Sequence, residues 1–89
     1  MRIGVAADHA GAELRDAIAR HVRGMGHEVV DYGGPNGPDD DYPLIVAPLA
    51  HAIRRGDVER GLFFCGSGIG PAIAANKIDG VRATVVTEA

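Results

Sequence analysis

Hydrophobic and polar positions follow two different patterns in the first third of the chain. The stretch "RIGVAA" (Arg2 to Ala7) is almost continuously apolar, which is typical of a short strand covered on both faces. Apolar residues then recur at spacings of three and four from Leu14 to Met25, with charged residues between them. This pattern predicts an amphipathic helix, and Gly24 and Gly26 supply its stop signal.

The same alternation continues in the middle of the chain. "HEVVDY" (His27 to Tyr32) is predicted to be a second strand, and the Gly- and Pro-rich residues from Gly33 to Tyr42 a loop. "PLIVAPLAHAIRRG" (Pro43 to Gly56) is predicted to be a second helix, opened by proline. An interior proline costs roughly 3 kcal/mol in a helix. We therefore expect Pro48 to distort the first turn, or the regular helix to begin near Pro48.

The last third of the chain repeats the pattern on a smaller scale. "RGLFFC" (Arg60 to Cys65) is predicted to be a third strand, "PAIAANK" (Pro71 to Lys77) a third helix, and "VRATVVT" (Val81 to Thr87) a fourth strand. Strands that alternate with helices form parallel βαβ units. The sequence therefore predicts an α/β protein, a three-layer αβα sandwich with a four-stranded parallel sheet, in a single domain of residues 1–89.

Composition narrows the classes of function. A net charge of -3 without a basic run argues against nucleic-acid binding, and 4% aromatic residues with no Trp argue against a base-stacking surface. A single cysteine cannot form an internal disulfide. Neither a signal peptide nor a run long enough to span a membrane is evident. We expect a cytoplasmic enzyme or binding domain.

The glycine-dense turn "CGSGIG" (Cys65 to Gly70) follows the third predicted strand directly. Its spacing excludes a dinucleotide fingerprint, because Pro71 stands where the third glycine is needed. It also excludes a nucleophile elbow around Ser67, and no P-loop triplet is present. Metal-ligand spacing of His or Cys is absent, and the acidic run at 39–41 is interpreted as a solvated loop. We therefore expect no metal and no cofactor.

Two interpretations of this turn are open. Several backbone N–H groups at the start of a helix can hold a phosphate or an oxygen that becomes negative during a reaction. The same field would lower the pKa of the Cys65 thiol and make it a base or nucleophile. Alternatively, Cys65 is an ordinary strand-end residue that packs as a small hydrophobe.

A second candidate cluster lies in "ADHAG" (Ala7 to Gly11), where the first predicted strand enters the first helix. Asp8 is a helix-capping residue in one interpretation and a binding residue in the other. His9 has less structural reason to be there, because its ring would point from the loop toward the crevice. Strand ends of a parallel sheet share one edge, so we expect this loop, the Cys65 turn and Tyr42 to lie near that edge.

Together "ADHAG", "DYP" and "CGSGIGPAIAANKIDGVRA" resemble the ribose-5-phosphate isomerase B family, which includes galactose-6-phosphate isomerase subunits. The resemblance implies a Rossmann-like sandwich and metal-free aldose–ketose isomerisation of a phosphorylated sugar, most specifically ribose 5-phosphate to ribulose 5-phosphate. It also implies homodimers with active sites at the interface.

The resemblance assigns roles to the residues of the two loops. Cys65 matches the catalytic base that moves a proton from C2 to C1, and Ser67 a hydroxyl residue that assists it. A branch of the family uses a glutamate just past the turn, but Pro71 stands there. Asp8 and His9 match the sugar-phosphate-binding pair, and Tyr42 an active-site tyrosine. The loop whose amides stabilise the enediolate oxygen matches Gly66, Ser67, Gly68, Ile69 and Gly70.

The resemblance also departs from the family at the C-terminal side. Family members continue with a further helix, strand and terminal helix, which carry a ring-opening histidine and phosphate-binding arginines. These residues have no counterpart in residues 1–89, and Arg82 is not one of those arginines. The alternative to an isomerase is therefore a truncated, catalytically impaired phosphate-binding or interaction module.

Overall fold

The predicted alternation of strands and helices is confirmed from the first strand to the third. The computed structural model describes residues 1–8, 10–33, 42–65, 75–76, 80–82 and 84, except for the side chains of residues 42–45. The described residues form, in order, β1 (Arg2–Ala7), α1 (Ala12–Gly24), β2 (Glu28–Asp31), α2 (Tyr42–Arg55) and β3 (Arg60–Phe64). No helix in this part of the chain is long and apolar enough to cross a membrane.

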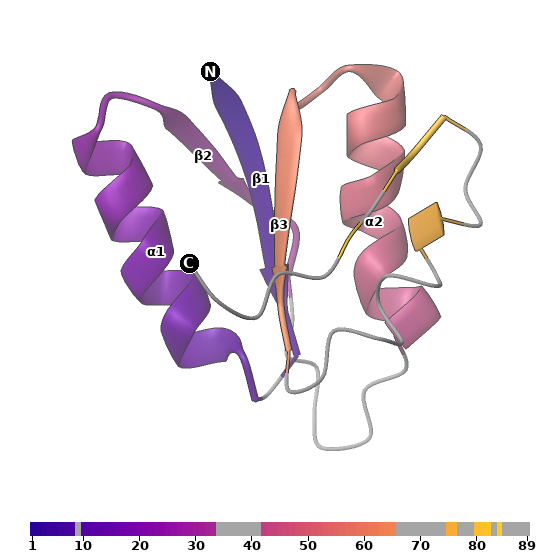
Figure 1. Ribbon diagram of the computed structural model, residues 1–89, viewed down its shortest axis with the longest axis horizontal. Helices are drawn as coiled ribbons and strands as arrows, with labels where there is room; N and C mark the ends of the chain where they lie inside the picture. The colour runs from indigo at the N-terminus through magenta and orange to yellow at the C-terminus, as the bar shows by residue number, and fades with distance from the viewer. Residues whose placement is uncertain (9, 34–41, 66–74, 77–79, 83, 85–89) are drawn as a thin grey trace.

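The strands form a parallel sheet in the order β2-β1-β3. In the register, Ile3 lies opposite Val29 of β2 on one side and Arg60 of β3 on the other. Helix α1 covers one face of the sheet and α2 the other (Figure 1). This is the predicted α/β sandwich with a parallel, Rossmann-like arrangement.

Two paired glycines let α2 approach the sheet closely. Gly4 of β1 and Gly61 of β3 are partners in the register. A Cβ atom at Gly4 would lie 2.6 Å from Leu49 Cδ1, and one at Gly61 would lie 2.7 Å from Ile53 Cδ1. The missing side chains leave the space into which Leu49, itself 5% exposed, is packed.

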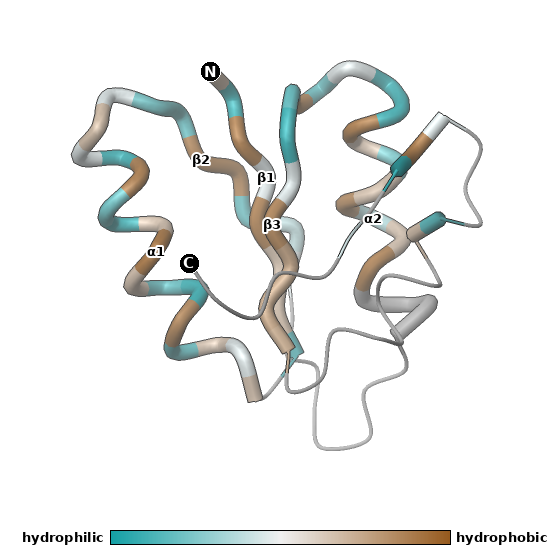
Figure 2. The backbone as a smooth tube through the Cα atoms, in the orientation of Figure 1, coloured by the Kyte–Doolittle hydropathy of each residue, from teal (hydrophilic) through white to brown (hydrophobic). Residues whose placement is uncertain are grey.

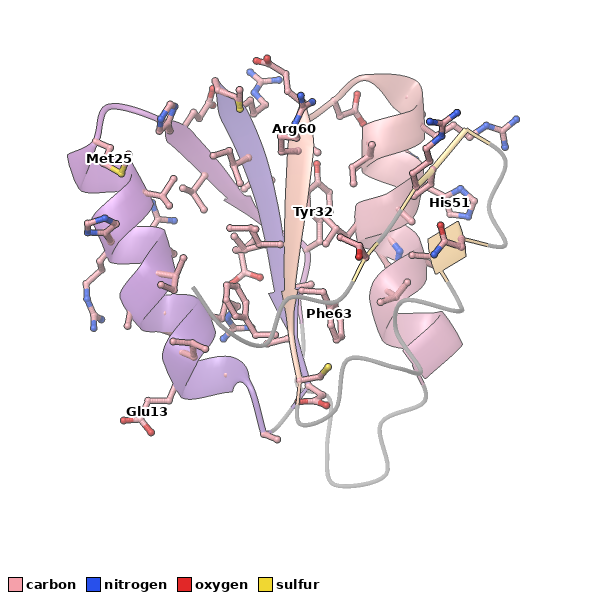
Figure 3. The ribbon with its side chains drawn as sticks, in the orientation of Figure 1. Glu13, Met25, Tyr32, His51, Arg60 and Phe63 are labelled. Carbon is pink, nitrogen blue, oxygen red and sulfur yellow. The ribbon has the colours of Figure 1, made fainter. Side chains whose placement is uncertain are left out.

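The core lies on both sides of the central strand. Figure 2 shows hydrophobic residues concentrated in the sheet, whereas the helices alternate between hydrophobic and hydrophilic positions. On the α2 side, Phe63 packs against a buried cluster of Val46, Ala50 and Val81. Phe63 and Tyr32 both extend from the sheet toward α2 (Figure 3).

The predicted four-stranded sheet needs correction, because the described residues form three strands. Val81, Arg82 and Thr84 belong to the predicted fourth strand but have no strand conformation. Gly80 has a φ of 83°, and Val81 is buried against Val46 and Ala50 of α2. The remainder of that strand lies outside the described residues. The predicted third helix is described only at Ala75 and Asn76, which are helical.

Helix α2 runs without interruption through Pro48. The expectation that the regular helix begins near Pro48 is therefore wrong, since it begins at Tyr42. Proline has no N–H to donate to the carbonyl of Leu44, but Pro48 lies on the exposed face of the helix. Leu49, buried against Gly4 and Gly61 of the sheet, helps to hold the helix in place despite the lost hydrogen bond.

Candidate active site

The candidate site lies at the carboxyl edge of the sheet. Strands β1 and β3 end at this edge, and α1 and α2 begin there (Figure 1). The register pairs Ala7 with Phe64, the last residues of their strands. The backbone N–H of Asp8 donates to the carbonyl of Phe64 at 3.0 Å. Asp8 and Cys65 are therefore neighbours at the point where the two strands end.

Asp8 is buried, with 3% of its surface exposed. Its Oδ1 accepts hydrogen bonds from the backbone N–H groups of Ala10 at 2.9 Å and Gly11 at 3.0 Å. Helix α1 has Gly11 as its N-cap, without a side-chain capping bond. Asp8 thus holds the turn before the helix instead of capping the helix directly, and one carboxylate oxygen serves this purpose.

Gly11 packs against the end of β3. A Cβ atom here would overlap the carbonyl carbon and oxygen of Phe64 and lie 2.6 Å from its Cβ. The backbone of Gly11, with φ of -101° and ψ of -4°, is open to other residues. Glycine is therefore required at this position because there is no room for a Cβ atom, and not because of the backbone conformation. The sequence pattern did not single out Gly11, although a glycine directly before a helix in "ADHAG" was a usable signal.

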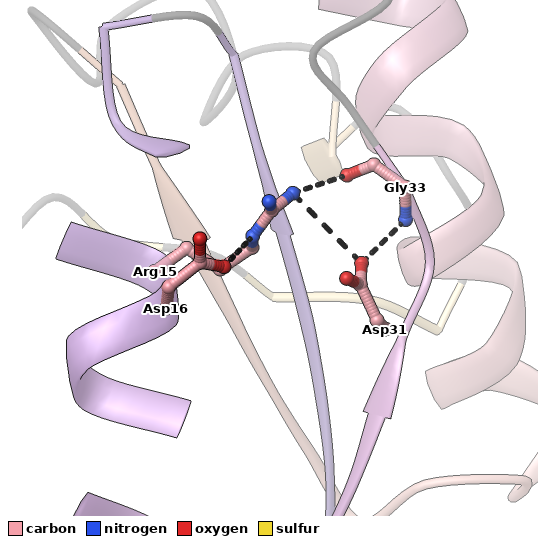
Figure 4. Close-up of polar contacts among 4 residues, drawn as sticks. All are labelled: Arg15, Asp16, Asp31 and Gly33. Atoms are coloured by element: carbon pink, nitrogen blue, oxygen red, sulfur yellow. Dashed lines mark hydrogen bonds and ion pairs between the residues drawn. The ribbon is translucent and has the colours of Figure 1, made fainter. Parts of the chain in front are cut away.

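Arg15 ties the end of β2 to helix α1 (Figure 4). Its side chain is only 11% exposed. Its guanidinium donates to Asp16 Oδ1 at 3.1 Å and to the carbonyl of Gly33 at 3.3 Å, and lies 3.9 Å from Asp31 Oδ1. The same Gly33 carbonyl accepts from the N–H of Ala7 at 3.3 Å. The ends of β1 and β2 are thereby fixed together beside the candidate site.

Cys65 is the chain's single cysteine and directly follows β3. The residue is half-buried. A thiol that follows a sheet strand at its carboxyl edge can act as a base or nucleophile on a molecule bound there.

The other candidate residues are only partly covered by the described residues. Tyr42 begins α2 at the carboxyl edge, but its side chain is outside the described part. His9 and the predicted turn residues Gly66, Ser67, Gly68, Ile69 and Gly70 also lie outside it. The structure therefore brings Asp8 and Cys65 together. Within the described part of the chain, no group of His, Cys, Asp and Glu side chains could hold a metal ion.

These features define a class: a parallel α/β protein with a thiol and a buried carboxylate at the carboxyl edge of its sheet. The model of the ribose/galactose isomerase family matches residues 3–89. The chain belongs to this family, as the resemblance in its sequence indicated.

Relatives and solved structures agree with this assignment. The chain is 40% identical to D-erythrulose-4-phosphate isomerase of Pectobacterium atrosepticum over 93% of this chain and 55% of the relative. It is 39% identical to ribose-5-phosphate isomerase B of Escherichia coli over 98% of this chain and 58% of the relative. The structure of ribose-5-phosphate isomerase B from Clostridium thermocellum superimposes with a TM-score of 0.85 at 40% identity, over 92% of this chain and 55% of that one.

The chain is short by comparison with these proteins. It spans little more than half the length of the curated relatives that it matches. Membership of the family therefore does not by itself establish the catalytic activity or the substrate of this chain.

Proposed function

We propose that this protein isomerises a phosphorylated sugar between its aldose and ketose forms, with ribose 5-phosphate and ribulose 5-phosphate as the pair. The observation that carries the proposal is the position of Cys65 beside Asp8 at the carboxyl edge, in a chain of the ribose/galactose isomerase family. The names of the relatives favour a small phosphorylated sugar as the substrate.

The chemistry requires one base and one site for negative charge. In the proposed reaction the Cys65 thiolate takes the proton from C2 of the open-chain aldose, and the electrons of that bond form the C1–C2 double bond of an enediolate. The C1 carbonyl electrons move onto O1 in this step, and O1 then takes the proton of the C2 hydroxyl. The electrons of the C1–C2 double bond take a proton from the Cys65 thiol at C1, and the oxygen on C2 becomes the ketose carbonyl. A positioned base contributes about 10²–10⁴-fold to such a step. Amide donors to the oxyanion contribute roughly 3 kcal/mol each.

The remaining site residues keep their predicted roles in this proposal. The backbone amides from Gly66 to Gly70 stabilise the enediolate oxygen, and the Ser67 hydroxyl assists. Asp8 and His9 bind the sugar phosphate, with Tyr42 at the same site. No metal or cofactor takes part.

A substrate comparison tests the proposal. Conversion of ribose 5-phosphate and of the ketose D-erythrulose 4-phosphate is followed by NMR with the same protein preparation. The proposal predicts turnover of ribose 5-phosphate with the higher kcat/KM. Preference for erythrulose 4-phosphate would keep the reaction class and change the substrate, whereas turnover of neither sugar would reject the isomerase.

The alternative to an isomerase is a module that binds a sugar phosphate without turnover. Calorimetry with ribose 5-phosphate distinguishes the two: heat of binding without conversion supports the module.

The proposal also includes a homodimer in the cytoplasm. Sedimentation equilibrium tests the dimer, and a monomer at all concentrations would reject it.

A further inference from the structure

The β1–α1 loop and the end of β3 are joined by three contacts, which we call the β1–α1 clamp. The N–H of Asp8 donates to the Phe64 carbonyl at 3.0 Å. Asp8 Oδ1 accepts from the N–H of Gly11 at 3.0 Å. The α-carbon of Gly11 packs against the Phe64 carbonyl so closely that a Cβ atom would overlap it. The clamp therefore consists of Asp8, Gly11 and Phe64.

We infer that Gly11 is a positioning residue that fixes where the Cys65 thiol lies at the candidate site. The carbonyl that Gly11 touches is bonded to the backbone nitrogen of Cys65, so displacement of this carbonyl must move Cys65. Asp8 sets the distance, because its oxygen draws the N–H of Gly11 toward the turn while its own N–H holds Phe64. The role of Gly11 in catalysis rests on the proposed function, but its role in placing the thiol does not.

The size of the expected displacement follows from sterics. Non-bonded carbon atoms pack at about 3.5–4.0 Å, whereas a Cβ at Gly11 would lie 2.6 Å from Phe64 Cβ and closer still to its carbonyl. The obstructing atoms include backbone, which cannot rotate aside as a flexible side chain can. The loop and the strand end must therefore separate by the order of 1 Å, a misplacement that can cost about 10²-fold in kcat.

Alkylation of the single cysteine measures this placement without reference to turnover. The rate of reaction with iodoacetamide is recorded against pH for the wild type, Gly11→Ala and Gly24→Ala, with circular dichroism to confirm folding. Gly24 is the matched control, because nothing lies within 4 Å of its Cβ position. We expect Gly11→Ala to change the rate several-fold or shift the midpoint of the profile, while Gly24→Ala reproduces the wild type.

The possible outcomes separate the inference from the proposed function. A Gly11→Ala profile identical to wild type overturns the positioning role, whether or not the protein turns over sugar phosphate. A changed profile together with a fall in kcat supports both ideas. If the wild type does not isomerise the sugar phosphate, a changed alkylation profile for Gly11→Ala still supports the positioning role, while the absence of turnover rejects the isomerase.

A second pair of variants decides the case in which Gly11→Ala does not fold. Asp8→Ala and Asp8→Asn both remove the carboxylate charge, but only Asp8→Asn keeps an oxygen that can accept the N–H of Gly11. Different Cys65 alkylation profiles for these two variants support the clamp. Identical profiles for the pair overturn it.

Discussion

The paired glycines of the sheet lead to a quantitative prediction at Gly61. A Cβ atom at Gly61 would lie 2.7 Å from Ile53 Cδ1, and 3.1 Å from Leu49 Cδ1. The closest approach is about 1 Å shorter than an ordinary carbon–carbon contact. The obstructing atom is the tip of an isoleucine, and valine at the same position lacks it. Gly61→Ala and Ile53→Val therefore form a matched pair for a double-mutant cycle.

The expected cost follows from two opposing effects. Overpacking a well-filled core costs typically 1–3 kcal/mol. Replacing glycine inside a strand recovers roughly 0.5–1 kcal/mol of backbone entropy. The net destabilisation by Gly61→Ala is therefore about 1 kcal/mol, which lowers the Tm of a domain this size by roughly 4–8 °C. Ile53→Val alone costs about 0.5–1.5 kcal/mol.

Thermal and urea unfolding of the two single variants and the double variant measure the coupling. Because Ile53→Val removes the atom that Gly61→Ala strikes, the double variant is expected to lose about 1 kcal/mol less than the sum of the singles. Gly24→Ala is the control for the same chemical change in open space, and we expect it to leave the Tm unchanged or raise it. Additive effects of Gly61→Ala and Ile53→Val would refute the close packing of α2 on the sheet.

Three further substitutions test other parts of the structure. Leu49→Ala removes a buried side chain from the space above Gly4 and is expected to cost about 2–5 kcal/mol in urea unfolding; a loss below about 1 kcal/mol would contradict the packing. Asp8→Ala leaves the N–H groups of the turn without their acceptor and is expected to cost about 1–3 kcal/mol, with Asp8→Asn less harmful. Arg15→Met frees the end of β2, so amide hydrogen exchange in β2 should accelerate while exchange in β3 stays unchanged; equal acceleration in both strands would argue against a local role.

Much of the fold was predictable because local patterns and tertiary packing agree. The apolar run of β1 and the three-and-four spacing of α1 specify their elements without reference to distant residues. The predicted fourth strand is described only at Val81, Arg82 and Thr84, and these residues have no strand conformation. A β-branched sequence such as "VRATVVT" favours a strand, but a strand forms only where its backbone finds hydrogen-bond partners, and the local pattern does not specify them.

The sequence was sufficient to predict the reactive residues of the candidate site, but not Gly11 and Arg15, which hold the surrounding backbone in place. Asp8 and Cys65 were expected at one edge, because parallel strands end together, and the register confirms that they are neighbours. The clamp at Gly11 depends on contact with Phe64, far away along the chain, which no local pattern encodes. Arg15 was expected among the polar residues of its helix, yet its side chain is mostly buried against the end of β2. A long side chain can bury its stem while its charged head finds partners.

Solvent hydrogen exchange at the sugar provides the most direct test of the central claim, that the Cys65 sulfur is the base. Ribose 5-phosphate is incubated in D2O with the wild type and with Cys65→Ala, after both are shown to be folded, and deuterium entering the carbon-bound positions at C1 and C2 is followed by NMR. The account predicts incorporation with the wild type and a loss of about 10²–10⁴-fold in its rate with Cys65→Ala. Incorporation by Cys65→Ala at the wild-type rate would contradict it.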